Sequence, residues 1–251
     1  HRVLRGGAYE TDLPTVRGPV KAKAPFLPDD WKLAQSFTGR PVKMTLPGPM
    51  TITDTTADEH YGDARALGRD LAEALNKEVL ALAEAGCKYI QIDEPLFARK
   101  PQEALDYGLE NIARCWQGVP PGVTKTMHMC CGYPNYLDQE DYVKADPQAY
   151  FDLAKAVDES VVDAVSIEDA HRHNDLSLLD LFGNTTVIFG VIAIARSRVE
   201  TVEEVRERLQ AALQHLPPER LVAAPDCGLG HLGRELAMKK LKVLSEAAKS
   251  V

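Results

Sequence analysis

Six times along the chain, a short β-favouring segment is followed by a longer segment whose apolar residues recur at helical spacing. In the first unit, "PVKMTLPGP" (41–49) precedes a helical pattern over 58–85, which ends at the stop signal Gly86. The other units pair 87–95 with 102–116, "TKTMHMC" with 147–157, "DAVSIEDA" with "LSLLDLF", "TTVIFGVIA" with 201–216, and "LVAAPDCG" with 232–249. Strands that alternate with helices in this way predict a parallel sheet covered by helices.

Two α/β architectures fit this alternation: a doubly wound open sheet and a TIM-type (β/α)8 barrel. A Gly-rich phosphate loop, the mark of a dinucleotide-binding open sheet, follows none of the strands. Polar residues instead gather at the C-terminal ends of the strands, where a barrel keeps its active site. They are Asp93 and Glu94, His128 and Cys130, Glu168 and Asp169, and Asp226 and Cys227. We therefore predict a single catalytic barrel domain over 1–251.

The number of β-α units falls short of eight. Beyond the six clear units, only "VKAKA" near 20–24 resembles a strand, and the chain opens at "HRVLRGGAYE" without an initiator methionine. The expectation is a barrel that is N-terminally incomplete, lacking its first one or two strands in this chain.

The composition indicates which classes of binding partner and which cellular compartment fit this chain. A formal charge of −8 argues against nucleic acid or an anionic membrane as the main partner. The longest apolar stretch, 187–195, is far too short to span a bilayer. Five cysteines form an odd set without the dense spacing of a secreted disulfide scaffold. These features predict a soluble cytoplasmic protein with reduced thiols, of undetermined oligomeric state, that acts on small molecules.

His128 and Cys130 are the first candidate metal ligands, because residues i and i+2 of a strand face the same side. Alone, this pair fits a small buried cysteine beside a satisfied histidine better than a metal site. Cys227, at the end of another predicted strand, changes that balance, since one His and two Cys are typical of catalytic zinc. Glu168 could supply a fourth, exchangeable ligand. Cys131 faces the other way and is interpreted as a packing residue.

The remaining candidates are carboxylates and histidines near the same strand ends. Asp93 and Glu94 could bind substrate, or they could simply cap the end of their strand. His171 and His173 follow Glu168 closely and could support the site or contact substrate, although loop histidines are more often only solvated.

At these residues the sequence resembles the C-terminal catalytic barrel of the cobalamin-independent methionine synthases. The resemblance runs through "LAQSFTGRPVKMTLPGPMTI", "AGCKYIQIDEP", "HMC", "VSIE" and "ERLVAAPDCGL", nearly the whole chain. It implies zinc held by His128, Cys130, Glu168 and Cys227, with Asp93 of "QIDEP" contacting the amino-acid substrate. It also implies methyl transfer to homocysteine.

Three departures from that family fall on the methyl-donor side. Thr55 stands where the family places a tryptophan against the pterin, and Arg99 lies near the place of a folate-contacting glutamate. Ala195 replaces a histidine, and Ala193 an aspartate, of the family's "YDIHSP" strand end. About fifteen extra residues around 133–150 could form a lid or a different substrate wall.

The sequence therefore predicts a zinc-dependent S-methyltransferase whose acceptor is a small thiol, homocysteine first, and whose donor could differ from methyl-tetrahydropteroylglutamate. Asp93 and Glu168 are the predicted catalytic residues, and Asp93, Glu94, His171 and His173 the predicted substrate contacts. Three alternatives stay open: alkyl or epoxide transfer to another thiol such as coenzyme M, a metal-free lyase of the uroporphyrinogen-decarboxylase-like group, and a non-catalytic metal-binding barrel.

Overall fold

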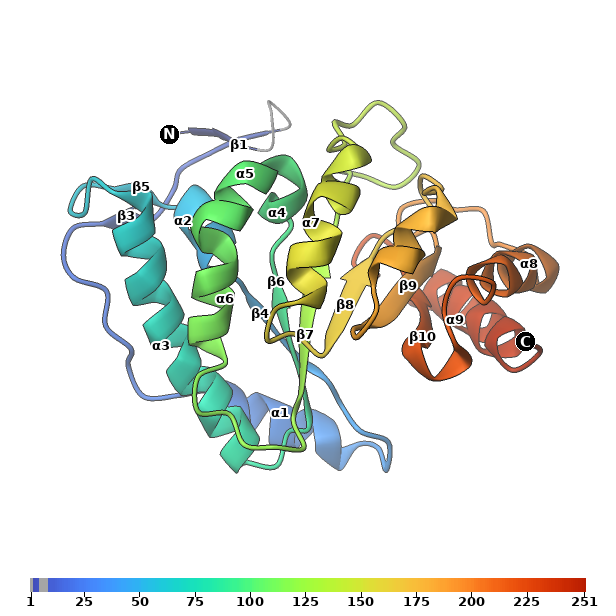
Figure 1. Ribbon diagram of the computed structural model, residues 1–251, viewed down its shortest axis with the longest axis horizontal. Helices are drawn as coiled ribbons and strands as arrows, with labels where there is room; N and C mark the ends of the chain where they lie inside the picture. The colour runs from blue at the N-terminus through green and yellow to red at the C-terminus, as the bar shows by residue number, and fades with distance from the viewer. Residues whose placement is uncertain (1, 5–8) are drawn as a thin grey trace.

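The computed structural model describes residues 2–4 and 9–251, and its centre is a six-stranded parallel sheet (Figure 1). The strand order is β10-β9-β8-β7-β6-β4, so every neighbour pair is consecutive along the sheet-forming part of the chain. The strands are β4 (Met44–Pro47), β6 (Tyr89–Asp93), β7 (Thr124–Met129), β8 (Ala164–Ile167), β9 (Thr186–Ile192) and β10 (Leu221–Pro225). Such β-α-β progression in one direction is the topology of a TIM-type barrel wall, and the predicted fold class is confirmed.

Helices connect successive strands and cover the outer face of the sheet (Figure 1). They are α1 (Leu27–Ser36), α2 (Pro49–Asp54), α3 (Ala64–Glu84), α4 (Leu96–Arg99), α5 (Pro101–Glu103), a π-helix (Ala104–Gly108), α6 (Leu109–Cys115), α7 (Gln148–Asp158), α8 (Val202–Ala212) and α9 (Arg234–Ala248), with 3-10 turns at Leu176–Leu181 and Pro218–Arg220. Their apolar faces join the strand residues in one buried cluster.

The structure departs from the predicted elements in three places. The helix predicted over 58–85 begins only at Ala64, as α3, because Gly62 has φ +60 and the Asp63 side chain then caps α3 by accepting from the Arg65 amide, and the short α2 before it was not predicted. The second predicted helix divides into α5, the π-helix and α6. The strand predicted near 20–24 is wrong, since the structure assigns no strand to these residues.

Two small sheets lie outside the main one. β1 (Arg2–Leu4) pairs antiparallel with β2 (Tyr9–Thr11), and β3 (Thr15–Val16) pairs with β5 (Ala57–Asp58). Among the described residues the main sheet is open, with β4 and β10 at its edges. Whether strands precede this chain stays a prediction. No helix of the described part of the chain combines the length and apolar character needed to cross a membrane.

Candidate metal and substrate site

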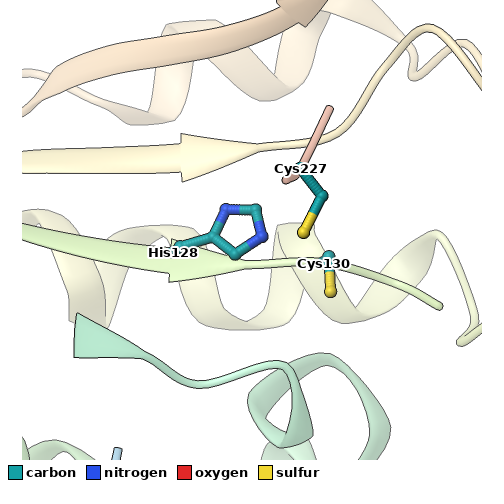
Figure 2. A group of neighbouring side chains, drawn as sticks. All are labelled: His128, Cys130 and Cys227. Atoms are coloured by element: carbon teal, nitrogen blue, oxygen red, sulfur yellow. The ribbon is translucent and has the colours of Figure 1, made fainter. Parts of the chain in front are cut away.

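Three ligand-bearing side chains converge at the C-terminal end of the sheet. Potential ligand atoms of His128, Cys130 and Cys227 all lie within 4.8 Å of one another, the one such group found among the described residues. Figure 2 shows the ring of His128 and the sulfur of Cys227 turned toward each other, with Cys130 just beyond the end of β7. We call these three residues the ligand triad.

The triad can form only because the sheet curls. Cys227 follows β10, and β10 is separated from β7 by β8 and β9. Three strand spacings of about 4.8 Å would put β7 and β10 roughly 14 Å apart in a flat sheet. Contact within 4.8 Å therefore requires the curvature of a barrel wall.

Strand register fixes the orientation of His128. Asp93, His128 and Ser166 are direct neighbours across β6, β7 and β8. The His128 Nδ1 consequently lies 2.9 Å from the Ser166 Oγ, and both residues are buried. The His128 Nε2 is buried and has no hydrogen-bond partner among the described residues. A buried ring nitrogen left free beside two sulfurs fits a metal ligand.

The two triad cysteines differ in how readily they ionise. A hydrogen bond with Cys130 lowers the pKa of the Cys227 thiol, and the nearby His128 lowers it further. The same hydrogen bond between the two cysteines, together with burial, raises the pKa of Cys130. Burial lowers the pKa of His128, but the Cys227 sulfur and the Asp93 carboxylate outweigh it and leave a net rise. One thiolate is thus favoured even without a cation, so the donor set is prepared for a soft divalent metal.

Glu168 lies near the ligand triad, but its carboxylate forms hydrogen bonds with other groups. Its Oε1 accepts from the Lys144 ammonium at 2.8 Å, and its Oε2 accepts from the Cys131 amide at 3.2 Å. Its carboxylate does not belong to the group within 4.8 Å. The structure therefore brings together three of the four predicted ligands. Cys131 is 1% exposed in the core, as its predicted packing role requires.

Asp93 faces a cavity of about 380 Å³ that the triad borders. Its Oδ1 accepts from the Gln91 amide at 2.7 Å, and Gln91 in turn accepts from Lys43. Burial raises the pKa of Asp93, an effect that His128 and Gln91 partly offset. The cavity is lined by Thr45, Pro47, Thr51, Asp93, Pro95, Arg99, His128, Cys130, Gly132, Tyr133 and Cys227.

Glu94 does not line that cavity. Its Oε1 accepts from the Met50 amide at 2.8 Å, and its Oε2 from the amide and hydroxyl of Thr51. The carboxylate thus satisfies the N-terminal amides of α2, and it leaves no room for a side chain at Gly48. Its full burial raises its pKa to about 7 despite these bonds. The geometry favours the capping alternative over substrate binding for this residue.

The two predicted histidine contacts also lie apart from the triad. The His171 Nε2 accepts from the amides of Ile194 and Ala195, and burial with nearby cations lowers its pKa to about 4, so the ring is neutral. His173 is exposed and lines a separate cavity of about 410 Å³ around the Arg208–Asp169 ion pair. Neither lines the cavity beside the triad.

The extra residues after Cys131 form a wall of the site. This loop, 132–147, is the yellow-green segment at the top of Figure 1. Tyr133 bonds the Gly228 carbonyl at 3.2 Å, and the Asp138 amide bonds the Ala195 carbonyl at 2.7 Å, which ties the loop to the ends of β9 and β10.

Sequence reasoning missed Ser166, Tyr133 and Lys144. Ser166 precedes Glu168 by two residues and so shares its face, a pattern that could have identified it. Lys144 and Tyr133 lie on a loop without a periodic pattern, and no sequence signal places them near the ligands.

Comparison with known proteins shows the family of this chain. The family profile described as "Cobalamin-independent synthase, Catalytic domain" matches residues 7–250. Curated methionine synthases of Saccharolobus solfataricus and Pyrococcus furiosus are 34% and 32% identical over 95% and 98% of this chain, which spans about two thirds of each (67% and 68%). A solved B12-independent methionine synthase from a Shewanella species, in complex with selenomethionine, superposes with a TM-score of 0.89 at 30% identity, covering 99% of this chain and 73% of that one.

The parallel barrel-type sheet and the match to methionine synthases place this chain among α/β methyltransferase enzymes, and its His/Cys/Cys triad is a group that could hold a metal ion. The chain belongs to the cobalamin-independent methionine synthase catalytic-domain family.

Proposed function

We propose that this protein transfers a methyl group to the sulfur of homocysteine, with zinc held by His128, Cys130 and Cys227. The observation that carries the proposal is the ligand triad at the edge of a cavity that also presents Asp93. Family membership supports the reaction class, and the selenomethionine complex of the Shewanella relative supports an amino-acid thioether as product.

The donor set suits thiol alkylation. A free alkyl thiol has a pKa of about 8.5 and is mostly protonated at neutral pH. Zinc in a His/Cys/Cys site would hold the acceptor sulfur as a thiolate at neutral pH. In the transfer, a sulfur–methyl bond forms while the methyl–donor bond breaks, and the donor leaves with the electron pair. The thioether product is a neutral, weaker ligand than the thiolate, which favours its release.

Asp93 is proposed to bind the α-amino group of the acceptor. Its carboxylate is oriented by Gln91, and it lies next to His128 in the strand register. An ammonium–carboxylate contact is a charge-assisted bond, stronger than a neutral one. The same negative charge would repel the sulfonate of coenzyme M, so this position favours an amino-acid thiol over that alternative.

Ser166 is proposed to set the tautomer of His128. If the Nε2 binds the metal, the Nδ1 carries the ring proton, and this N–H donates a hydrogen bond to the Ser166 Oγ at 2.9 Å. Outer partners of this kind fix the ring orientation and raise ligand basicity.

The methyl donor is proposed to differ from methyl-tetrahydropteroylglutamate. The Thr55 hydroxyl bonds the Thr51 carbonyl within α2, and Thr55 does not line the cavity. Arg99 does line it, and one of its amino groups donates to the Val143 carbonyl. Ala195 is 1% exposed and has no titratable group. The three positions therefore offer no aromatic surface, no carboxylate and no imidazole to a pterin.

The test is methionine formation by zinc-loaded protein from homocysteine and a panel of donors. The panel comprises methyl-folate mono- and polyglutamates, methylcobalamin and S-methylated sulfonium compounds, with product measured by mass spectrometry. His128→Ala and Cys227→Ala should each lose activity by about 100-fold or more because each removes a ligand. Ser36→Ala, which removes an exposed hydroxyl on α1, is the matched control.

Each part of the proposal has its own contradicting result. Full activity of Cys227→Ala, or of protein stripped of metal, would exclude the metal-dependent transferase and favour the lyase alternative. Good turnover with methyl-folate would overturn the donor argument from Thr55, Arg99 and Ala195. Coenzyme M outcompeting homocysteine would overturn the role of Asp93.

A further inference from the structure

Two consecutive hydrogen bonds connect the edge of the main sheet with Asp93. The Lys43 ammonium donates to the side-chain oxygen of Gln91, and the Gln91 side-chain nitrogen donates to the Asp93 Oδ1 at 2.7 Å. Gln91 is only 8% exposed, whereas Lys43 is an exposed residue. A buried amide needs partners for both of its polar ends, and Lys43 and Asp93 supply one each.

Strand geometry places this chain of contacts beside the candidate site but not inside its cavity. Gln91 and Asp93 are i and i+2 on β6, so their side chains share a face. Lys43 lies two residues before Thr45, and Thr45 is the direct neighbour of Gln91 on β4. Thr45 and Asp93 line the cavity of about 380 Å³, but Lys43 and Gln91 do not. Lys43 therefore influences a molecule in this cavity through Asp93, not by contact.

The donors and acceptors of these three side chains fit only one orientation of the Gln91 amide. An ammonium can only donate hydrogen bonds, and an ionised carboxylate can only accept them. The amide oxygen must consequently face Lys43, and the amide NH2 group must face Asp93. Because both ends require the same orientation, the amide holds the Asp93 Oδ1 at a fixed position.

This arrangement orients Asp93 without neutralising its charge. Among the described residues, Asp93 belongs to no ion pair within 4.0 Å. A lysine in direct contact with the carboxylate would compete with the ammonium of a substrate for the same oxygens. The neutral amide between them restrains Oδ1 and leaves the second oxygen to form a charge-assisted hydrogen bond.

We propose that Lys43 is a positioning residue for the amino group of the acceptor thiol. Through Gln91, it holds the Asp93 carboxylate in the orientation in which its second oxygen meets the substrate ammonium. The inference rests on the proposed function, in which Asp93 binds that amino group. None of the three residues is a predicted metal ligand, so this role is separate from metal binding.

The test compares two thiols that differ only in the amino group, homocysteine and 4-mercaptobutanoate. Calorimetric titration into the zinc-loaded full chain gives both dissociation constants. Wild type should bind homocysteine about 10–100-fold more tightly, the scale of one charge-assisted hydrogen bond. Lys43→Met should reduce that ratio by about 3–10-fold, the scale of one ordinary hydrogen bond, and should change the affinity for 4-mercaptobutanoate by less than about 2-fold. Lys43→Arg keeps a cationic donor and should bring the ratio to within about 2-fold of wild type.

A double variant tests whether the effect of Lys43 passes through Gln91. Gln91→Leu removes the connecting amide and should by itself lower the ratio about as much as Lys43→Met does. Adding Lys43→Met to Gln91→Leu should cause no further loss, because residues that act through one network are not additive. If Gln91→Leu does not fold, Gln91→Met keeps the side-chain length and serves instead. A full additional loss in the double variant would overturn the inference, because the Lys43 charge would then act without the amide.

Steady-state kinetics provide the second readout. Lys43→Met should raise the KM for homocysteine about 3–10-fold and leave kcat within about 2-fold of wild type, because the lost contact orients a group that binds substrate. Zinc affinity, measured by chelator competition, should be unchanged. A purely structural role of Lys43 would instead weaken the binding of both thiols to the same extent.

Lys125→Met is the matched control. The Lys125 ammonium lies 3.7 Å from the carboxylate of Asp163, just before β8. Lys125 is three residues from His128 on β7, so it lies on the opposite face of that strand, and it does not line the cavity. Its replacement should leave the ratio of the two thiol affinities unchanged.

The two proposals fail in different ways. If wild type distinguishes the two thiols but folded Lys43→Met shows the same ratio, only the role of Lys43 is overturned. If wild type binds both thiols equally well, the role of Asp93 in the proposed function is overturned, and the role of Lys43 with it.

Discussion

Ser166→Ala tests whether the cross-strand neighbour of His128 prepares it for metal binding. The substitution removes the one hydrogen bond shown for the His128 ring, 2.9 Å long and between buried residues. The ring Nδ1 then has a buried N–H without a partner, and the ring is freer to turn away from the cysteines. Ser166 adjoins His128 in the β7–β8 register, so the backbone itself need not move.

The expected loss follows from these contacts. An unsatisfied buried donor costs about 1–3 kcal/mol, and loss of an outer partner of a ligating histidine typically weakens metal binding by about 10–100-fold. These two figures agree, because 10–100-fold corresponds to about 1.4–2.7 kcal/mol. We therefore expect the zinc dissociation constant of Ser166→Ala to rise about 10–100-fold.

Chelator competition measures this constant, and circular dichroism of the metal-free protein checks that the fold is retained. Ser36→Ala on α1 removes an exposed hydroxyl that also makes one hydrogen bond, of 2.7 Å, and should bind zinc as wild type does. A folded Ser166→Ala with unchanged zinc affinity would refute the argument that strand register orients the ligand.

Three further variants test single residues near the site. Asp93→Asn should raise the KM for homocysteine about 10–100-fold, since a charge-assisted bond contributes about 1.5–3 kcal/mol. Its zinc affinity should stay within about 3-fold of wild type. An unchanged KM would contradict binding of the amino group by Asp93. Cys131→Ala should lower the melting temperature but leave zinc affinity unchanged, and a weakened affinity would make Cys131 a ligand. Glu94→Gln should lower the free energy of unfolding in urea by about 1–3 kcal/mol, because the amide NH2 group leaves one N–H of α2 facing a donor. Unchanged stability together with impaired turnover would instead support a role of Glu94 in substrate binding. Since the pKa of Glu94 rises from 4.5 to about 7 on folding, the folded state retains a proton that the unfolded state releases, and this contribution to stability is lost as pH rises from about 4.5 to about 7. The stability gap between wild type and Glu94→Gln should therefore be larger at pH 5 than at pH 8.

Much of the fold follows from periodicity in the sequence. The five later β-α units lie close to their predicted positions, and α8 and α9 begin within two residues of the expected starts. The failures have local causes. A glycine with positive φ and a capping aspartate delay the start of the first predicted helix to Ala64. Residues 20–24 form no strand, and the Val20 amide instead donates to the Tyr61 hydroxyl at 2.7 Å.

The candidate site, like the fold, was predictable from the sequence only in part. The i, i+2 spacing of His128 and Cys130 fixes that these two face one side, and the polar strand ends identify Asp93 and Cys227 as partners. The side that Glu94 faces was undecided in the sequence, because either strand-end capping or substrate binding suits a carboxylate there. The contacts with Met50 and Thr51 favour capping.

What the sequence alone determined is the order of strands and helices and the residue types at the strand ends, because both depend on local spacing along the chain. Only the tertiary structure decided that Cys227 reaches His128, since this requires the sheet to curl across three strand spacings. It also decided that Lys144, from a loop without periodicity, pairs with Glu168. Neither contact is encoded by spacing, because each joins segments whose separation is set by the curvature of the sheet and by how the loops pack on it.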